Sequence, residues 1–131
     1  YFAKTPPKSL DRDDFADAIQ SVSGLSAEDG AATLSAFSVA AIVHGQEHFP
    51  EPAKRWLVCG GGRLNGTLME LMTRSLGTPV DPIEAVDLNG DALEAQAFAF
   101  LAIRSFYGMP LSLPGTTGAP RPLNGGILYE S

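Results

Sequence analysis

Apolar residues recur at helical spacing in the first third of the chain. Between Asp11 and Gly24, positions that share one helical face carry Phe15, Ala18, Ile19 and Val22. Asp11 and Asp14 are typical of a helix cap followed by an acidic first turn. A second helix is predicted from Ser26 to about His44. Because it is apolar on most sides, we expect it to be buried in the centre of its domain.

A short strand and a third helix follow, joined by a run of glycines. The apolar residues 56–59 predict a buried strand that stops at Gly60–Gly62, and helical spacing returns from Asn65 to about Ser75. Prolines 79 and 82 interrupt the next segment. There we expect short edge strands around Val80 and near Val86.

The last helix is predicted to begin near Asn89 or Asp91 and to continue to about Phe106, and residues 126–129 are a candidate final strand. The order of helices, strand, helix, strand and helix predicts an α/β fold with a small sheet packed by helices. The length fits a single domain over residues 1–131.

Composition narrows the classes of partner. The formal net charge of -6 and the lack of a basic block argue against nucleic acid, and no apolar run approaches the roughly 18 residues of a membrane span. A single cysteine excludes an internal disulfide and suits a reducing compartment. The first residues do not have the pattern of a signal peptide, and the missing initiator Met indicates a processed product or a piece of a longer protein.

The glycine run is the sharpest candidate for a binding site. Gly60, Gly61 and Gly62 allow the backbone to approach a ligand closely, and the next helix presents free N–H groups to an anion or a ribose hydroxyl. Asn65 is placed either to cap that helix or to reach the ligand. The spacing matches neither the dinucleotide fingerprint nor the phosphate loop. Spacing alone therefore leaves ligand binding and a plain strand-to-helix turn equally open.

Two carboxylates begin the last predicted helix. Asp91 and Glu94 continue a line that becomes apolar at Phe98 and Leu101, where we expect burial. Capping is the favoured interpretation of Asp91, whereas Glu94 points along the predicted buried face and could border a cleft. Cys59, at the end of a buried strand, is interpreted as a small apolar filler.

Several segments, in this order, resemble the second half of the anhydro-N-acetylmuramic acid kinases. The resemblance covers nearly the whole chain, although residues 9–12 depart from the family's usual Ser-Thr-Gly-Arg. The segments that carry it are Tyr1-Phe2-Ala3-Lys4, Pro6-Pro7-Lys8-Ser9, Ala32-Thr33-Leu34, Val58-Cys59-Gly60-Gly61-Gly62 with Asn65, Leu68 and Met69, Gly90-Asp91 with Glu94-Ala95 and Phe98-Ala99, and Thr117-Gly118-Ala119.

The resemblance implies a C-terminal domain of the actin-like ATPase (ribonuclease H-like) fold, with a small mixed sheet. Members of the family use ATP and Mg²⁺ to phosphorylate 1,6-anhydro-N-acetylmuramic acid as its anhydro bond is hydrolysed, giving N-acetylmuramic acid 6-phosphate in murein recycling. It places Gly60, Gly61, Gly62 and Asn65 on the nucleotide side and Glu94, with Asp91, on the sugar side. It also implies a cytoplasmic protein.

The same resemblance implies that the catalytic residues lie outside this chain. In the family, the N-terminal domain supplies the phosphate-binding loop and the aspartate that activates water. Since phosphoryl transfer needs groups on both sides of the phosphate, we expect no sugar phosphorylation and weak ATP binding from this chain alone. We also expect an exposed inter-domain face and hence self-association, with a homodimer as one form.

Two other functions fit the sequence. One is a non-catalytic nucleotide- or sugar-binding module that keeps the same fold. The other is a methyltransferase-like glycine loop, which requires an acidic residue at the end of the next strand. Asp81 and Glu84 lie at that distance, but Pro79 and Pro82 are expected to break up the strand.

Overall fold

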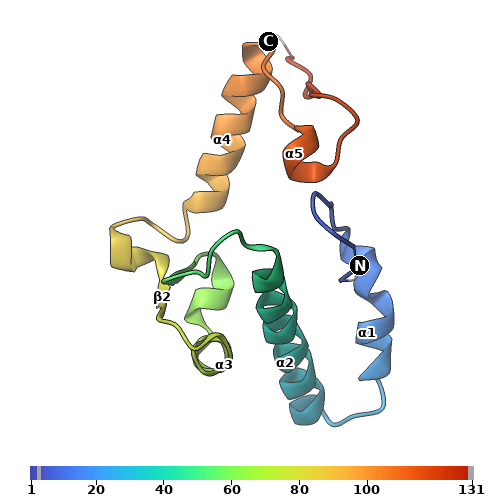
Figure 1. The fold of residues 1–131 in the computed structure, drawn as a ribbon, viewed down its shortest axis with the longest axis vertical. Helices are drawn as coiled ribbons and strands as arrows, with labels where there is room; N and C mark the ends of the chain where they lie inside the picture. Colours follow the sequence, from blue (N-terminus) through green and yellow to red (C-terminus); the bar gives the residue numbers. More distant parts are fainter. Residues whose placement is uncertain (3, 130–131) are drawn as a thin grey trace.

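The computed structural model describes residues 1–2 and 4–129, which form five α-helices and two strands (Figure 1). Short 3-10 turns precede α1 and follow α2, β1 and β2. The elements are α1 (Ala16–Ser21), α2 (Ala27–Gly45), β1 (Trp56–Val58), α3 (Gly66–Leu76), β2 (Val80–Pro82), α4 (Leu93–Phe106) and α5 (Pro114–Thr117).

The first two predicted helical segments begin at the predicted capping residues. Asp11 and Asp14 form a reciprocal capping box, although the first turn is a 3-10 helix (Arg12–Phe15) that leads into α1. The Ser26 hydroxyl accepts a hydrogen bond from the backbone N–H of Asp29 at 3.1 Å, so α2 begins where predicted.

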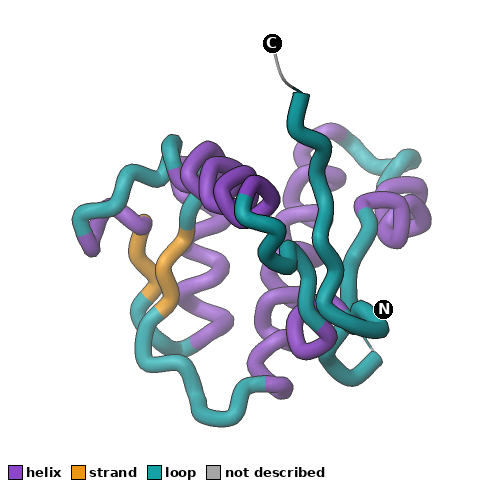
Figure 2. Tube along the Cα trace, turned by 90° about the horizontal axis from the view of Figure 1, so that it is seen from above, coloured by secondary structure: helices purple, strands orange, loops and turns teal. Residues whose placement is uncertain are grey.

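The strands β1 and β2 form a parallel pair in which Trp56 is opposite Val80 and Val58 is opposite Pro82. Helix α3 connects them, so residues 56–82 form a βαβ unit (Figure 2). The expected mixed sheet is wrong for the described residues, whose one sheet is parallel.

Two predicted strands do not form. The segment near Val86 is a 3-10 turn (Ile83–Val86), because Pro82 ends β2 and Asp87 turns the chain with a φ of 59°. Residues 126–129 form no strand, and Gly126 has a φ of 84°. In the described part of the chain, the nearest ladder contact is an isolated antiparallel bridge between Ser112 and Leu123.

The core lies where α2 and α3 meet the sheet. Val39 of α2 contacts Met72 and Leu76 of α3, and all three are at most 8% exposed. Partly buried side chains surround this cluster, namely Ile42, Val43, Trp56, Val58, Leu68, Leu71 and Val80. The packing therefore fixes the βαβ unit against α2.

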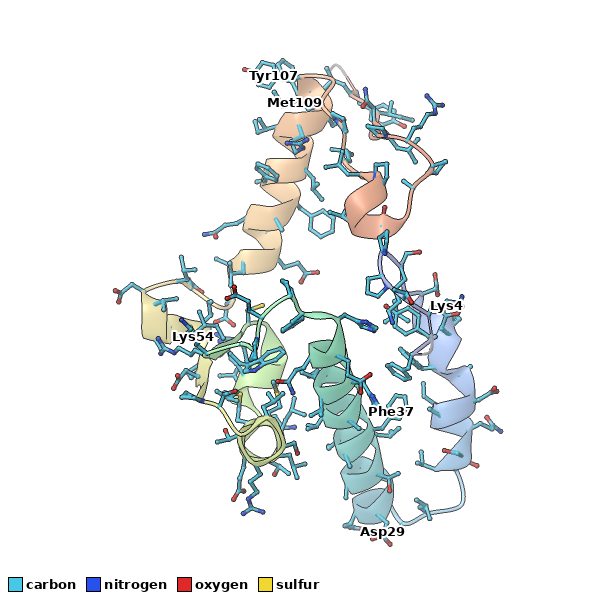
Figure 3. All side chains as sticks on the ribbon, viewed as in Figure 1. Lys4, Asp29, Phe37, Lys54, Tyr107 and Met109 are labelled. Atoms are coloured by element: carbon cyan, nitrogen blue, oxygen red, sulfur yellow. The ribbon has the colours of Figure 1, made fainter. Side chains whose placement is uncertain are left out.

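The prediction that α2 is buried in the centre of its domain is wrong for this chain. Val39 is its one buried residue among those described. Phe37 projects from α2 toward the N-terminal segment (Figure 3), and its ring lies 5.5 Å from that of Phe15 in the 3-10 turn before α1. Helix α3 packs against α2 (Figure 1), and the residues of α2 other than Val39 are half-buried or exposed.

Helix α4 extends away from the core, and none of its described residues is buried. Phe98 is 65% exposed, so the predicted burial along its apolar line is wrong. Tyr107 and Met109 lie beyond its far end, away from α2 and α3 (Figure 3). Among the described residues, no helix has the length and apolar character needed to span a bilayer.

Candidate functional site

The glycine run forms a tight turn between β1 and α3. Gly60 has a φ of 70°, which strongly favours glycine, and residues Gly61–Leu64 form a 3-10 turn. A side chain at Gly61 would meet nothing within 4 Å, whereas one at Gly62 would lie 3.3 Å from Leu68. Gly61 therefore borders open space, and Gly62 packs against α3.

Asn65 caps α3. Its Oδ1 accepts a hydrogen bond from the backbone N–H of Leu68 at 3.1 Å, so one of its two predicted roles is confirmed. The side-chain amide nitrogen makes no hydrogen bond to the described part of the chain and remains available for a ligand.

A cavity of about 590 Å³ lies between the glycine turn and the start of α4. It brings Gly60 and Gly61 together with Asp91 and Glu94, although about 30 residues separate the two pairs. Gly62 and Asn65 do not line it. The lining residues are Cys59, Gly60, Gly61, Gly90, Asp91, Leu93, Glu94 and Ala97.

Arg63 joins the two sides of this cavity and was not singled out from the sequence. Its Nη1 donates to the carbonyl oxygen of Gly60 at 3.0 Å, and its Nη2 donates to Oδ1 of Asp91 at 2.8 Å. Its Nε donates to Oε1 of Glu84, also at 2.8 Å. Its acidic partners lie 21 and 28 residues further along the sequence. Spacing rules for helices and strands do not relate residues that are so far apart, so the sequence alone did not predict these pairs.

Glu84 receives two hydrogen bonds at one oxygen. Its Oε1 accepts from Arg63 and from the backbone N–H of Gly90 at 3.2 Å. The pKa of Glu84 is lowered chiefly by a hydrogen bond from its own backbone N–H and then by Arg63. The pKa of Arg63 is raised, first by its hydrogen bond to Glu84 and then by its hydrogen bond to Asp91.

Asp91 does not cap α4, contrary to the favoured interpretation. The Oδ1 of Asn89 accepts from the backbone N–H groups of Asp91 and Ala92, and α4 begins only at Leu93. Asn89 holds this turn because its short side chain reaches backbone donors two and three residues ahead. Asp91 is therefore free to pair with Arg63.

Glu94 lies in the first turn of α4 and lines the cavity. Within the described part of the chain, its exposed carboxylate has no hydrogen-bond or ion-pair partner. The carboxylate of Glu94 is thus available to a ligand in the cavity, and its role on the sugar side stays a prediction.

Cys59 also lines the cavity and is exposed, so its interpretation as a buried filler is wrong. Strand β1 ends at Val58, and the chain turns outward before Cys59 can enter the core.

The two candidate carboxylates for the methyltransferase alternative, Asp81 and Glu84, are both held in ion pairs. Contrary to expectation, the prolines do not prevent a short β2. However, Asp81 accepts from Nε of Arg55 at 2.8 Å, and Glu84 is held by Arg63. A cofactor ribose would have to displace one of these ion pairs, which disfavours that function.

Two other segments that carried the family resemblance lie side by side. A side chain at Gly118 would lie 3.2 Å from the carbonyl oxygen of Pro7, and Gly118 has a φ of 75°. The Thr117-Gly118-Ala119 turn therefore packs against the Pro6-Pro7-Lys8 segment, over 100 residues earlier in the chain. Glycine is required there by both its backbone conformation and its contact.

The sequence is similar over its whole length to one family of known proteins. The family described as anhydro-N-acetylmuramic acid kinase matches residues 1–131. A protein of that name from Rhodospirillum rubrum is 62% identical over 131 residues, which are 100% of this chain and 34% of the relative. One from Paramagnetospirillum magneticum is 60% identical over 96% of this chain and 36% of the relative.

A relative of the same name from Zymomonas mobilis is 49% identical over 98% of this chain and 35% of the relative. The chain thus spans about a third of the length of the curated relatives that it matches. The match extends over the glycine turn, the Gly90–Glu94 segment and the Gly118 turn together. The chain therefore belongs to the anhydro-N-acetylmuramic acid kinase family.

Proposed function

We propose that this chain is the C-terminal nucleotide- and sugar-side domain of a two-domain, cytoplasmic kinase with the actin-like ATPase fold. The complete protein uses ATP to phosphorylate 1,6-anhydro-N-acetylmuramic acid while its anhydro bond is hydrolysed, and it releases N-acetylmuramic acid 6-phosphate. Family membership supports the reaction. The observation that carries the site is the cavity in which the glycine turn faces Glu94.

The glycine turn is assigned to the nucleotide. Gly60 and Gly61 border the cavity without side chains, so a ribose or an adenine ring can approach the backbone there. Gly62 holds the turn against α3, and the amide nitrogen of Asn65 is a donor at the start of that helix.

The opposite wall is assigned to the sugar. The carboxylate of Glu94 can accept hydrogen bonds from sugar hydroxyls or from the N-acetyl amide, as carboxylates commonly do. Asp91 lines the same wall, and one of its oxygens is already bonded to Arg63. We therefore assign Glu94 the direct contact and Asp91 the border of the sugar site.

The catalytic groups are assigned to the missing N-terminal domain. Phosphoryl transfer depends on positioning and on charge stabilisation around the phosphate, and this chain supplies one wall of such a site. Among the described residues, no group of three or more His, Cys, Asp or Glu side chains could hold a metal ion, so we assign Mg²⁺ no ligand in this chain. The ion would accompany the phosphates of ATP and would supply charge stabilisation there. The chain alone should therefore bind ATP weakly and should not phosphorylate the sugar.

The proposal is tested by two substitutions in the full-length protein that contains this chain. Gly61→Leu fills open space rather than the core, so we expect a higher KM for ATP and an unchanged KM for the sugar. Glu94→Gln keeps the side-chain size but removes the charge, and it should raise the KM for the sugar only.

Two matched controls accompany these variants. Gly115→Leu places the same side chain where it also meets nothing within 4 Å, and Glu70→Gln removes an exposed carboxylate of α3. Neither control should change either KM. Equal effects of the site and control variants would refute the site, whereas ligand binding without turnover by the full-length protein would favour the non-catalytic module.

A further inference from the structure

One guanidinium connects three separate segments around the proposed site. Arg63 stands in the glycine turn, Glu84 follows β2, and Asp91 precedes α4. The same guanidinium also bonds to the carbonyl oxygen of Gly60. Both walls of the cavity are therefore attached to Arg63, which does not itself line the cavity.

The side chain of Arg63 is more buried than the basic side chains of the other described ion pairs. Its side chain is 5% exposed, whereas Arg74, which pairs with Glu70 on α3, is 72% exposed. The flat guanidinium fork places three N–H groups on three acceptors at once, which a lysine ammonium cannot reproduce in the same plane.

The backbone of Gly90 packs closely against this guanidinium. A Cβ at position 90 would lie 2.2 Å from Nε and 2.6 Å from Cζ of Arg63, so glycine lets the backbone lie against the charged group. The backbone N–H of Gly90 donates to the same Glu84 oxygen that Arg63 holds. The turn before α4 is thus packed directly on the Arg63–Glu84 pair.

We propose that Arg63 is a positioning residue that sets the distance between the glycine turn and Glu94, and so aligns the nucleotide with the sugar. Its importance for turnover rests on the function proposed above. Arg63 acts through the Gly60 carbonyl on one wall and through Asp91 on the other, without touching either ligand.

Loss of this residue should disturb geometry more than stability. Its two acidic partners are 46% and 79% exposed, so water can solvate them when the guanidinium is removed. The core cluster around Val39, Met72 and Leu76 does not include Arg63. A misplacement of about 1 Å at a reacting centre can nevertheless cost about 100-fold in rate.

The test compares Arg63→Ala and Arg63→Lys with Arg74→Ala in the full-length protein. We expect the two Arg63 variants to lose about 100-fold in kcat/KM with little change in the unfolding midpoint. Added ethylguanidinium should restore activity to Arg63→Ala, because it can occupy the vacated position, whereas ethylammonium should not. Arg74→Ala should behave like the wild type.

A second readout does not depend on turnover. The Gly90 amide should exchange with deuterium faster in both Arg63 variants than in the wild type or Arg74→Ala, since its acceptor is no longer fixed. If the wild type lacks kinase activity, the proposed function fails, and amide exchange still decides whether Arg63 holds the turn.

Unchanged kcat/KM and unchanged Gly90 exchange in Arg63→Ala would overturn the proposal, as would full restoration by lysine. Should Arg63→Ala fail to fold, Gly90→Ala provides the same test. Its Cβ displaces the end of the flexible Arg63 side chain while leaving the charge in the protein. It should then reproduce the loss of kcat/KM.

Discussion

At the residue scale, hydrogen bonding within the chain determines which polar atoms of the site can serve a ligand. The oxygen of Asn65 is used by the α3 cap, and one oxygen of Asp91 is used by Arg63. Glu94 keeps its carboxylate free within the described part of the chain. The three side chains therefore differ in availability although all were candidates from the sequence.

Asn65→Asp separates the capping role of this residue from its proposed nucleotide role. Aspartate caps a helix as well as asparagine, so the free energy of unfolding should change little, whereas Asn65→Ala should lose about 1 kcal/mol. The added negative charge should raise the KM for ATP by repelling its phosphates. Urea unfolding and steady-state kinetics check both effects. An aspartate variant with the wild-type KM would leave Asn65 as a cap only.

The contribution of the Glu84 contacts to the free energy of unfolding should depend on pH in one direction. The hydrogen bond from its own backbone N–H and then the contact with Arg63 lower the pKa of Glu84 in the folded protein from its ordinary 4.5, so these contacts contribute stability above that value. This contribution is lost as pH falls through the lower, folded pKa. The carboxyl carbon shift of Glu84, followed by NMR titration, measures this transition.

Arg63→Ala provides the control for that titration. The pKa of Glu84 should move part of the way back toward 4.5, since the hydrogen bond from its own backbone N–H remains. An identical titration of Glu84 in the wild type and in Arg63→Ala would contradict the pairing.

At the element scale, α4 is apolar on several sides and yet has no buried residue among those described. Phe98 and Phe106 are 65% and 63% exposed, which is unusual for large aromatic side chains. The isolated chain should therefore self-associate through this helix.

Substitution of both Phe98 and Phe106 by Ser should lower the average mass measured by light scattering at a given concentration. Ile19→Ser is the control, because Ile19 is 58% exposed on α1 and lies outside the proposed contact. A wild-type chain that stays monomeric over a wide range of concentration would contradict the expectation.

Elements with a local signal could be predicted from the sequence. The Ser26 and Asn65 caps located α2 and α3, and the apolar run before the glycines located β1. The prediction of a strand near Val86 was wrong, because a left-handed residue at Asp87 turns the chain after Pro82. The prediction that α2 and α4 are buried was wrong, because burial depends on which elements pack against a helix, and periodicity does not specify them.

The candidate site was predictable only in part for the same reason. The glycines and the two carboxylates were identifiable by residue type and spacing, and the structure brings Gly60 and Gly61 to Asp91 and Glu94. Arg63 was not predicted from the sequence, because its role depends on partners that are 21 and 28 residues away. Contacts of this kind arise because the chain after β2 returns to the glycine turn, which no local motif specifies.

At the scale of the whole molecule, the exposed surface is larger than a chain of this size normally leaves open. The described structure exposes 9641 Å², whereas a compact monomer of 13.8 kDa exposes about 6,600 Å². The relatives are also about three times as long as this chain. Both observations support the proposal that a second domain completes the fold and the site.

The most direct test of this account is the formation of N-acetylmuramic acid 6-phosphate from ATP and 1,6-anhydro-N-acetylmuramic acid. It is followed by phosphorus NMR with the full-length protein and, separately, with residues 1–131 alone. We predict that the full-length protein forms the product and that the isolated chain forms none. Turnover by the isolated chain, or its absence from the full-length protein, would contradict the account.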